Sequence, residues 1–295
     1  MRRGMVLCML LCLGALAAVK AQSPSPSAPI VIEVEKVKDN LWVLRGGGGN
    51  TAVFATAGGV VVVDAKNPGW GQPILDKIKT LTDKPVITLI NTHTHGDHVS
   101  GNVAFPATVE IVTQENTKAN MEKMPIFKET AGKGLPAKTF KDKMTLGKGA
   151  DQIDLYYFGP GHTNGDAWVA FPAHRIVHAG DLFARKELPF VDAGNGGSVL
   201  HYPETLRKAH GGIKNVDTII NGHSPAQTTW ADLKEFADFN QDFLTFAQEQ
   251  LKAGKTAEQG AAEWKLPEKY KGYSATARPD RLIGRFETLA AETKK

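Results

Sequence analysis

Residues 86–98 read VITLINTHTHGDH, a strand-like apolar run that ends in three histidines and an aspartate. Such a density of polar groups beside a buried strand requires partners. Alternate residues of an extended segment point the same way, so His93 and His95 can hold one metal ion, while Asp97 and His98, beyond the bend at Gly96, can turn toward a second. Imidazole and carboxylate ligands without sulfur suit Zn²⁺, Mn²⁺ or Fe²⁺. The stretch therefore predicts a metal centre at the end of a strand.

Strand-like and helix-like segments interleave on both sides of this stretch. Apolar and β-branched runs predict strands at residues 30–37, 41–44, 51–56, 60–64, 109–112, 153–158, 167–171, 175–178 and 218–220. Helical spacing predicts helices over 73–81 and 203–210. The four glycines at 46–49 are predicted to form a flexible turn. The interleaving predicts an α/β fold with mixed sheets.

The chain from about residue 230 onward is predicted to be helical. Residues 232–251 carry apolar side chains at three- and four-residue steps, and Thr229 with Asp232 resembles a capping box. A further helix is predicted over 281–291. We interpret these apolar stripes as core rather than as a cofactor site. Residues 230–295 are thus predicted to be a C-terminal helical extension.

The first 29 residues resemble an export signal. Two arginines precede the uncharged run from Met5 to Val19, which is shorter than a membrane span needs. Residues 1–21 are therefore predicted to be a signal peptide cut after Ala21, and 22–29 a Ser/Pro linker; an uncleaved anchor is the alternative. The predicted location is periplasmic or secreted. Cleavage would lower the formal charge from +4 to +1, which gives no reason to expect nucleic acid or an anionic membrane as a partner.

Both cysteines, Cys8 and Cys12, lie in this first segment. The rest of the chain can therefore form no internal disulfide and no zinc–thiolate site. Any metal must be held by nitrogen and oxygen alone.

The pattern His-x-His-x-Asp-His after an apolar strand resembles the signature of the metallo-β-lactamase superfamily. Three further motifs of that family have counterparts in the same order: GPGHTNGD at 159–166, VHAGDLF at 177–183 and IINGH at 219–223. The resemblance covers roughly residues 30 to 230. It implies a four-layer αβ/βα sandwich of two mixed sheets flanked by helices, with a hydrolase domain at 30–229.

The resemblance also implies a dinuclear site, most simply with two Zn²⁺, although Fe or Mn is possible. His93, His95 and His162 would hold the first metal, Asp97, His98 and His223 the second, and Asp181 would bridge them. Water between two divalent cations loses its proton near neutral pH, and the hydroxide can attack an ester, lactone, thioester or related bond. Asp97 would also orient this hydroxide.

Residues around the ligands receive weaker assignments. Asp64 resembles the family's aspartate that steadies a metal ligand, but it could equally cap a turn. Candidate pocket residues are Trp70, His201, Tyr202 and the segment 182–190, because they lie in loops near ligand-bearing strand ends. The expected partner is a small-molecule substrate, and the oligomeric state stays open.

Several functions share this ligand set. Without a cysteine ligand, and with Asp181 in the bridging position, the site is most similar to the glyoxalase II and lactonase type. An exported zinc hydrolase is therefore the first hypothesis. A β-lactamase is the alternative, since such an enzyme would be useful outside the cell. A non-hydrolytic iron oxidoreductase, similar to persulfide dioxygenases, and a non-catalytic metal scaffold are further alternatives.

Overall fold

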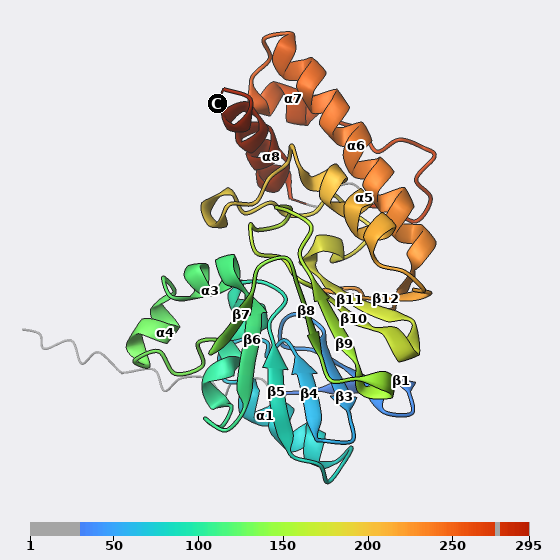
Figure 1. Cartoon of the computed structure of the whole chain (residues 1–295). Helices are drawn as coiled ribbons and strands as arrows, with labels where there is room; N and C mark the ends of the chain where they lie inside the picture. The colour runs from blue at the N-terminus through green and yellow to red at the C-terminus, as the bar shows by residue number, and fades with distance from the viewer. Residues whose placement is uncertain (1–29, 275–277, 295) are drawn as a thin grey trace, which may run out of the picture.

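A computed structural model describes residues 30–274 and 278–294 (Figure 1). The predicted signal peptide and Ser/Pro linker lie outside the described residues. Within the described residues, no helix combines the length and the apolar character that crossing a membrane would need.

The strands form two mixed sheets. The first contains seven strands in chain order: β1 (Glu33–Lys38), β2 (Leu41–Arg45), β3 (Thr51–Ala55), β4 (Val60–Val63), β5 (Val86–Ile90), β6 (Glu110–Gln114) and β7 (Lys138–Phe140). Pairing is antiparallel from β1 to β4 and parallel from β4 to β7. The second contains six in the spatial order β13 (Thr228–Thr229), β12 (Thr218–Asn221), β11 (Ile176–Gly180), β10 (Trp168–Phe171), β9 (Ile153–Tyr156) and β8 (Lys143–Leu146). Only β11 and β12 pair in parallel there.

The two sheets pack face to face and carry helices on their outer faces. One apolar cluster draws residues from both sheets, and the rings of Phe54 and Phe171 meet across it at 5.3 Å. Helix α1 (Gly71–Lys79) covers the first sheet with Ile74 and Ile78. Strands β3 and β4 are buried on both faces, which explains their continuous apolar sequence.

The outer face of the second sheet is covered by helices α5 (Tyr202–Gly212) and α6 (Trp230–Lys252). Helices α7 (Ala257–Glu263) and α8 (Pro279–Glu292) pack against α6 (Figure 1). The order of layers is therefore helix, sheet, sheet, helix. The predicted four-layer sandwich with a helical C-terminal region is confirmed, and the capping box of Thr229 and Asp232 begins α6.

Several short elements differ from the sequence prediction. The helices α3 (Glu115–Met121), α4 (Pro125–Glu129) and α7, and the strands β7 and β8, were not predicted. They span only three to seven residues each, too few for a period to stand out. The boundary predicted between the hydrolase domain and the extension, at residue 229, stays a prediction.

Candidate metal centre

Four loops bring the predicted ligands to one edge of the sandwich. His93 and His95 follow β5 of the first sheet, and the short helix α2 (Gly96–Val99) then presents Asp97 and His98. The other ligands follow β9, β11 and β12 of the second sheet, which all run in the same direction because β9 and β11 are each antiparallel to β10. These ligands are His162, Asp181 and His223.

The structure gathers all seven predicted ligands into overlapping groups. The ligand atoms of His93, His95 and His162 lie within 4.8 Å of one another, as do those of Asp97, His98 and His223. Asp181 lies between these groups: its carboxylate oxygens are 3.6 Å from His162 Nε2, 3.4 Å from His98 Nε2 and 3.2 Å from His223 Nε2. This is the position that a bridging carboxylate requires.

Two carboxylates fix the imidazoles of His98 and His95 from behind. Asp64 Oδ2 lies 2.7 Å from His98 Nδ1, and both side chains are fully buried. Asp64 also accepts hydrogen bonds from the backbone and hydroxyl of Thr92. Asp192 Oδ2 lies 2.7 Å from His95 Nε2. Since an ionised carboxylate only accepts, each imidazole donates to it and turns its other nitrogen toward the site.

Neighbouring oxygens orient the other two buried histidines in the same way. His162 Nδ1 lies 2.7 Å from the carbonyl oxygen of Phe190. His93 Nδ1 lies 3.0 Å from the hydroxyl oxygen of Thr92, whose proton goes to Asp64. His162 Nε2 and His93 Nε2 therefore point into the site as acceptors.

This arrangement leaves several buried acceptor atoms without a donor, and a bound cation would satisfy them. His95 Nδ1 and His162 Nε2 approach to 2.8 Å with both lone pairs facing inward. His93 Nε2 and Asp181 Oδ1 are buried and form no hydrogen bond. Buried acceptors without a donor are costly, and a divalent ion satisfies several at once. The donor set of nitrogen and oxygen thus fits a pair of metal ions.

The two groups of ligands differ in their affinity for protons. Burial and the neighbouring His95 lower the pKa of His162 to about 4, and burial holds the pKa of His93 well below its usual value. Burial also disfavours the charged form of His223, but hydrogen bonds to Asp181 and Asp97 outweigh it and raise the pKa of His223 to about 9. The charges of Asp181 and Asp64 likewise outweigh burial and raise the pKa of His98. Without metal, His98 and His223 of the second group therefore carry protons at neutral pH, whereas His93 and His162 of the first group do not.

Metal binding to the two groups is therefore expected to depend differently on pH. The protons of His223 and His98 must both leave before a metal binds, so affinity at the second group rises by up to about a hundredfold per pH unit below the pKa of His223, about 9. His93 and His162 of the first group have lowered pKa values and are already deprotonated at neutral pH, so these two ligands add no such pH dependence. Competition titrations of the metal-free protein against a zinc-sensitive dye, at several pH values, would measure both steps. Equal pH slopes for the two steps would contradict this expectation.

Glycines clear the space that the ligands occupy. A Cβ on Gly49 would lie 2.1 Å from His98 Cε1, and a Cβ on Gly222 would lie 2.0 Å from Asp181 Oδ1. The predicted flexible turn at 46–49 is held in place: Gly49 N donates to Asp97 O at 3.0 Å, and the buried ammonium of Lys66 donates to Gly49 O at 2.6 Å. This turn forms a fixed wall of the site.

A cleft of about 380 Å³ opens beside the ligands. Asp97 lines it, and its carboxylate is ionised at neutral pH: burial opposes ionisation, but the hydrogen bond with His223 and the charge of His98 lower the pKa of Asp97 to about 2. The loop after β11, which lies in the predicted pocket segment 182–190, supplies Arg185, Glu187, Pro189 and Phe190. Arg281 of α8 completes this wall.

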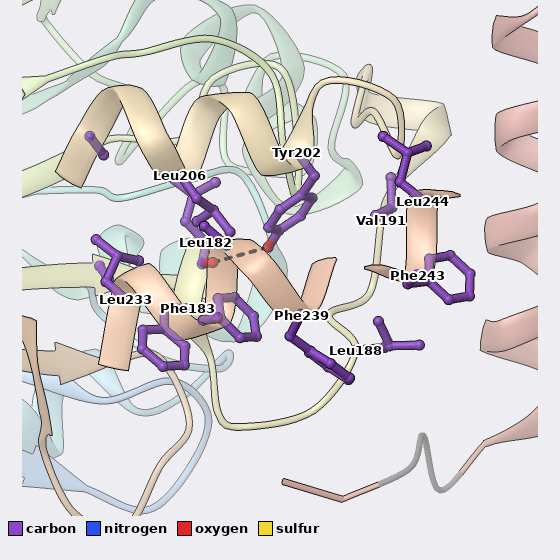
Figure 2. Close-up of a cluster of buried hydrophobic side chains, with 14 of the residues drawn as sticks. Leu182, Phe183, Leu188, Val191, Tyr202, Leu206, Leu233, Phe239, Phe243 and Leu244 are labelled. Atoms are coloured by element: carbon purple, nitrogen blue, oxygen red, sulfur yellow. Dashed lines mark hydrogen bonds between the residues drawn. The ribbon is translucent and has the colours of Figure 1, made fainter. Parts of the chain in front are cut away.

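Three residues predicted for the pocket lie outside the lining of this cleft. Tyr202 is fully buried, and its hydroxyl donates to the carbonyl oxygens of Asp181 and Leu182 at 3.1 Å. Figure 2 shows the hydrogen bond to Leu182. Trp70 packs against the backbone of Gly46 and Gly47. His201 is exposed before α5 and pairs with Ser198. Tyr202 therefore acts on the site only by fixing the backbone that carries Asp181.

Two residues that shape the site, Asp192 and Arg281, cannot be recognised from the sequence. Asp192 orients His95, yet the turn signal Asp192-Ala193-Gly194 says nothing about which side chain this carboxylate meets. Arg281 was placed only in a predicted amphipathic helix, and no local pattern brings that helix to the cleft. Both contacts join segments that are about ninety or more positions apart in the chain.

Comparisons with known proteins agree with this geometry. A family model described as metallo-beta-lactamase superfamily matches residues 44–223. A type 2 metallo-beta-lactamase from Elizabethkingia meningoseptica is 26% identical over 210 residues, which cover 65% of this chain and 78% of that protein. A hydroxyacylglutathione hydrolase from Crocosphaera subtropica is 30% identical over 153 residues, covering 50% of this chain and 49% of that protein.

A solved structure extends the likeness in fold. The sec-alkylsulfatase Pisa1 from Pseudomonas sp. aligns with a TM-score of 0.70 and 14% identity, over 89% of this chain and 50% of its own. An alignment of that extent includes part of the segment beyond residue 223. The family match covers well over half of the chain, the relatives named here are hydrolases, and the site fits metal ions. The chain therefore belongs to the metallo-beta-lactamase superfamily and is a metal-dependent hydrolase.

Proposed function

We propose that the protein is a dinuclear zinc hydrolase that cleaves an ester, lactone, thioester or related bond in a small molecule. The observation that carries this proposal is the position of Asp181, whose carboxylate touches His162 of one group and His98 and His223 of the other. His93, His95 and His162 would hold one ion, and Asp97, His98 and His223 the other. Bound ions would supply Lewis acidity toward the scissile bond and lower the pKa of water.

The chain's own residues orient the reacting groups. Asp97 faces the cleft with about a third of its side chain exposed, and as a carboxylate it can accept a hydrogen bond from the attacking water. Asp64 and Asp192 hold the imidazoles of His98 and His95 in fixed orientations. A rigid ligand frame of this kind keeps the acceptor atoms in place before the substrate enters.

A β-lactamase is the second candidate. The 26% identity with the Elizabethkingia enzyme over 65% of this chain favours it. The match to the hydroxyacylglutathione hydrolase, together with the bridging position of Asp181, favours ester or thioester cleavage. The ligand groups alone do not distinguish a β-lactamase from an esterase or thioesterase. Measured turnover of each substrate class must therefore decide between these two functions.

Elemental analysis followed by a hydrolase panel tests the proposal. Purified protein is expected to contain about two zinc ions per chain. The panel should include nitrophenyl esters, acyl-homoserine lactones, glutathione thioesters, sulfate and phosphate esters, and nitrocefin as the β-lactam. A protein without metal would overturn the proposal, and so would iron accompanied by oxygen uptake. Nitrocefin turnover that exceeds ester and thioester turnover would establish the second candidate.

We further propose that the enzyme acts in the periplasm or outside the cell. This rests on the arginines and the apolar run within residues 1–21, and on the absence of cysteine from the rest of the chain. Fractionation of cells that produce the full chain, with N-terminal sequencing of the product, would test it. A product that keeps Met1 and stays in the cytosol would contradict it.

A further inference from the structure

The loop that follows β11, residues 181–191, packs against the C-terminal helices. Leu182, Phe183, Leu188 and Val191 are buried among apolar side chains of α5 and α6 (Figure 2). The guanidinium of Arg285 on α8 is fully buried and donates to the carbonyl oxygen of Pro189 at 2.5 Å. The C-terminal extension therefore sets the position of this wall of the cleft.

Helix α8 also places a cation at the cleft. The guanidinium carbon of Arg281 lies 5.2 Å from the centre of the Phe190 ring. That ring lies in turn 5.9 Å from the ring of His95 and 5.9 Å from the ring of His162. Arg281 and the first group of ligands thus lie around the same aromatic ring and line the same cleft, so one small substrate can reach both.

Arg281 differs from two other arginines of this region. Arg278, at the N-cap of α8, pairs with Asp280 at 2.8 Å, and Arg185 lies 3.5 Å from Glu187. Among residues 30–274 and 278–294, no carboxylate lies within 4.0 Å of the Arg281 guanidinium. A half-buried guanidinium in a concave site, held over an aromatic ring and without an acidic partner, is suited to bind an oxyanion.

We propose that Arg281 selects substrates that carry an oxyanion, a carboxylate or a sulfonate, away from the bond that is cleaved. This inference rests on the proposed function and narrows its substrate class from small esters in general to anionic ones. Arg281 lies beyond residues 44–223, the part that matches the family, so this selectivity would come from the C-terminal extension. Arg185 lines the same cleft, but Glu187 lies beside it there and partners its charge.

Three matched esters test the proposal: para-nitrophenyl hemisuccinate, its sulfonate analogue and its neutral methyl ester. With the zinc-loaded full chain, at least one anionic ester is expected to have a kcat/KM about 10- to 100-fold above that of the neutral ester. Arg281→Gln is expected to raise KM for the anionic esters by a similar factor, with kcat and the neutral ester little changed. Arg281→Lys should recover part of the loss, and which anionic ester responds more identifies the preferred oxyanion.

Arg278→Gln is the control, because it removes the same charge from the residue that precedes α8, outside the cleft. Equal kcat/KM for all three esters, or equal effects of the two glutamine variants, would overturn the proposal. Calorimetric titration with succinate and with a disulfonate gives a readout independent of turnover. Binding that weakens about tenfold in Arg281→Gln supports the proposal even if none of the esters is hydrolysed, and binding that is absent or unchanged overturns it.

Discussion

Asp181→Asn is expected to lower kcat/KM for the hydrolysed substrate by at least about 1,000-fold, equivalent to about 4 kcal/mol of transition-state stabilisation. Asp181 lies among three histidines of both ligand groups, and one of its oxygens is buried without a hydrogen bond. The amide keeps the shape of the side chain but removes its charge and one acceptor. Metal content, measured by elemental analysis after dialysis, should fall from two ions per chain to about one or fewer.

Asp217→Asn is a suitable control for this experiment. Asp217 is exposed and pairs with Arg175 at the surface, so this substitution also removes one carboxylate charge while leaving the site intact. Its activity and metal content should match those of the unchanged protein. If Asp181→Asn retained two ions and near-normal activity, Asp181 would not be a bridging ligand.

Gly49→Ala is expected to disable the second ligand group without altering any ligand. The added methyl would lie 2.1 Å from His98 Cε1, and that ring cannot move freely, because it is fully buried and bound through Nδ1 to Asp64. The Gly49 backbone is fixed as well, by hydrogen bonds with Asp97 and Lys66. We expect loss of one metal ion and a fall in kcat of at least about 100-fold, given the cost of misplaced reacting groups.

Gly58→Ala gives the matched comparison for this substitution. Its added methyl would meet only Ile87 Cδ1, at 4.0 Å, so it should leave metal content and kcat unchanged. Thermal unfolding of both variants should be followed with and without zinc. If Gly49→Ala bound two ions as tightly as the unchanged protein, the wall formed by the glycine turn would not restrict His98.

Much of the fold and the ligand set could be predicted because both depend on local patterns. A buried strand reads as an apolar run, and each predicted ligand follows such a run within a few residues, as Asp181 follows β11 and His223 follows β12. Helix α6 was predicted because its apolar period extends over 23 residues and its capping box is local. Because all seven ligands must meet at one metal site, their family order also predicted that the strands they follow end at the same edge of the sandwich.

The surroundings of the site could not be predicted because they depend on packing between distant segments. Lys66 reads in the sequence as an ordinary surface lysine, yet it is fully buried, and its ammonium donates to the carbonyl oxygens of Leu44 in β2 and of Gly49 in the glycine turn. Burial lowers the pKa of Lys66 to about 7. Tyr202 is predicted for the pocket because it would lie in a loop near ligand-bearing strand ends, but it begins α5, and the close packing of α5 and α6 buries it. The residues that neighbour Lys66 and Tyr202 in the sequence give no local pattern that predicts the burial of either side chain.

Because the ligands come from both sheets, bound metal ions would contribute to stability as well as to catalysis. His93, His95, Asp97 and His98 belong to the half of the chain that forms the first sheet, and His162, Asp181 and His223 to the half that forms the second. Ions bound by ligands from both halves would cross-link the two sheets and so stabilise their packing. For each ion bound, a tenfold rise in free metal above the dissociation constant would then add about 1.4 kcal/mol to the stability of the assembled sandwich. Where zinc is scarce, the enzyme would lose resistance to unfolding and to proteases together with its chemistry, so the supply of metal would govern how long each molecule survives.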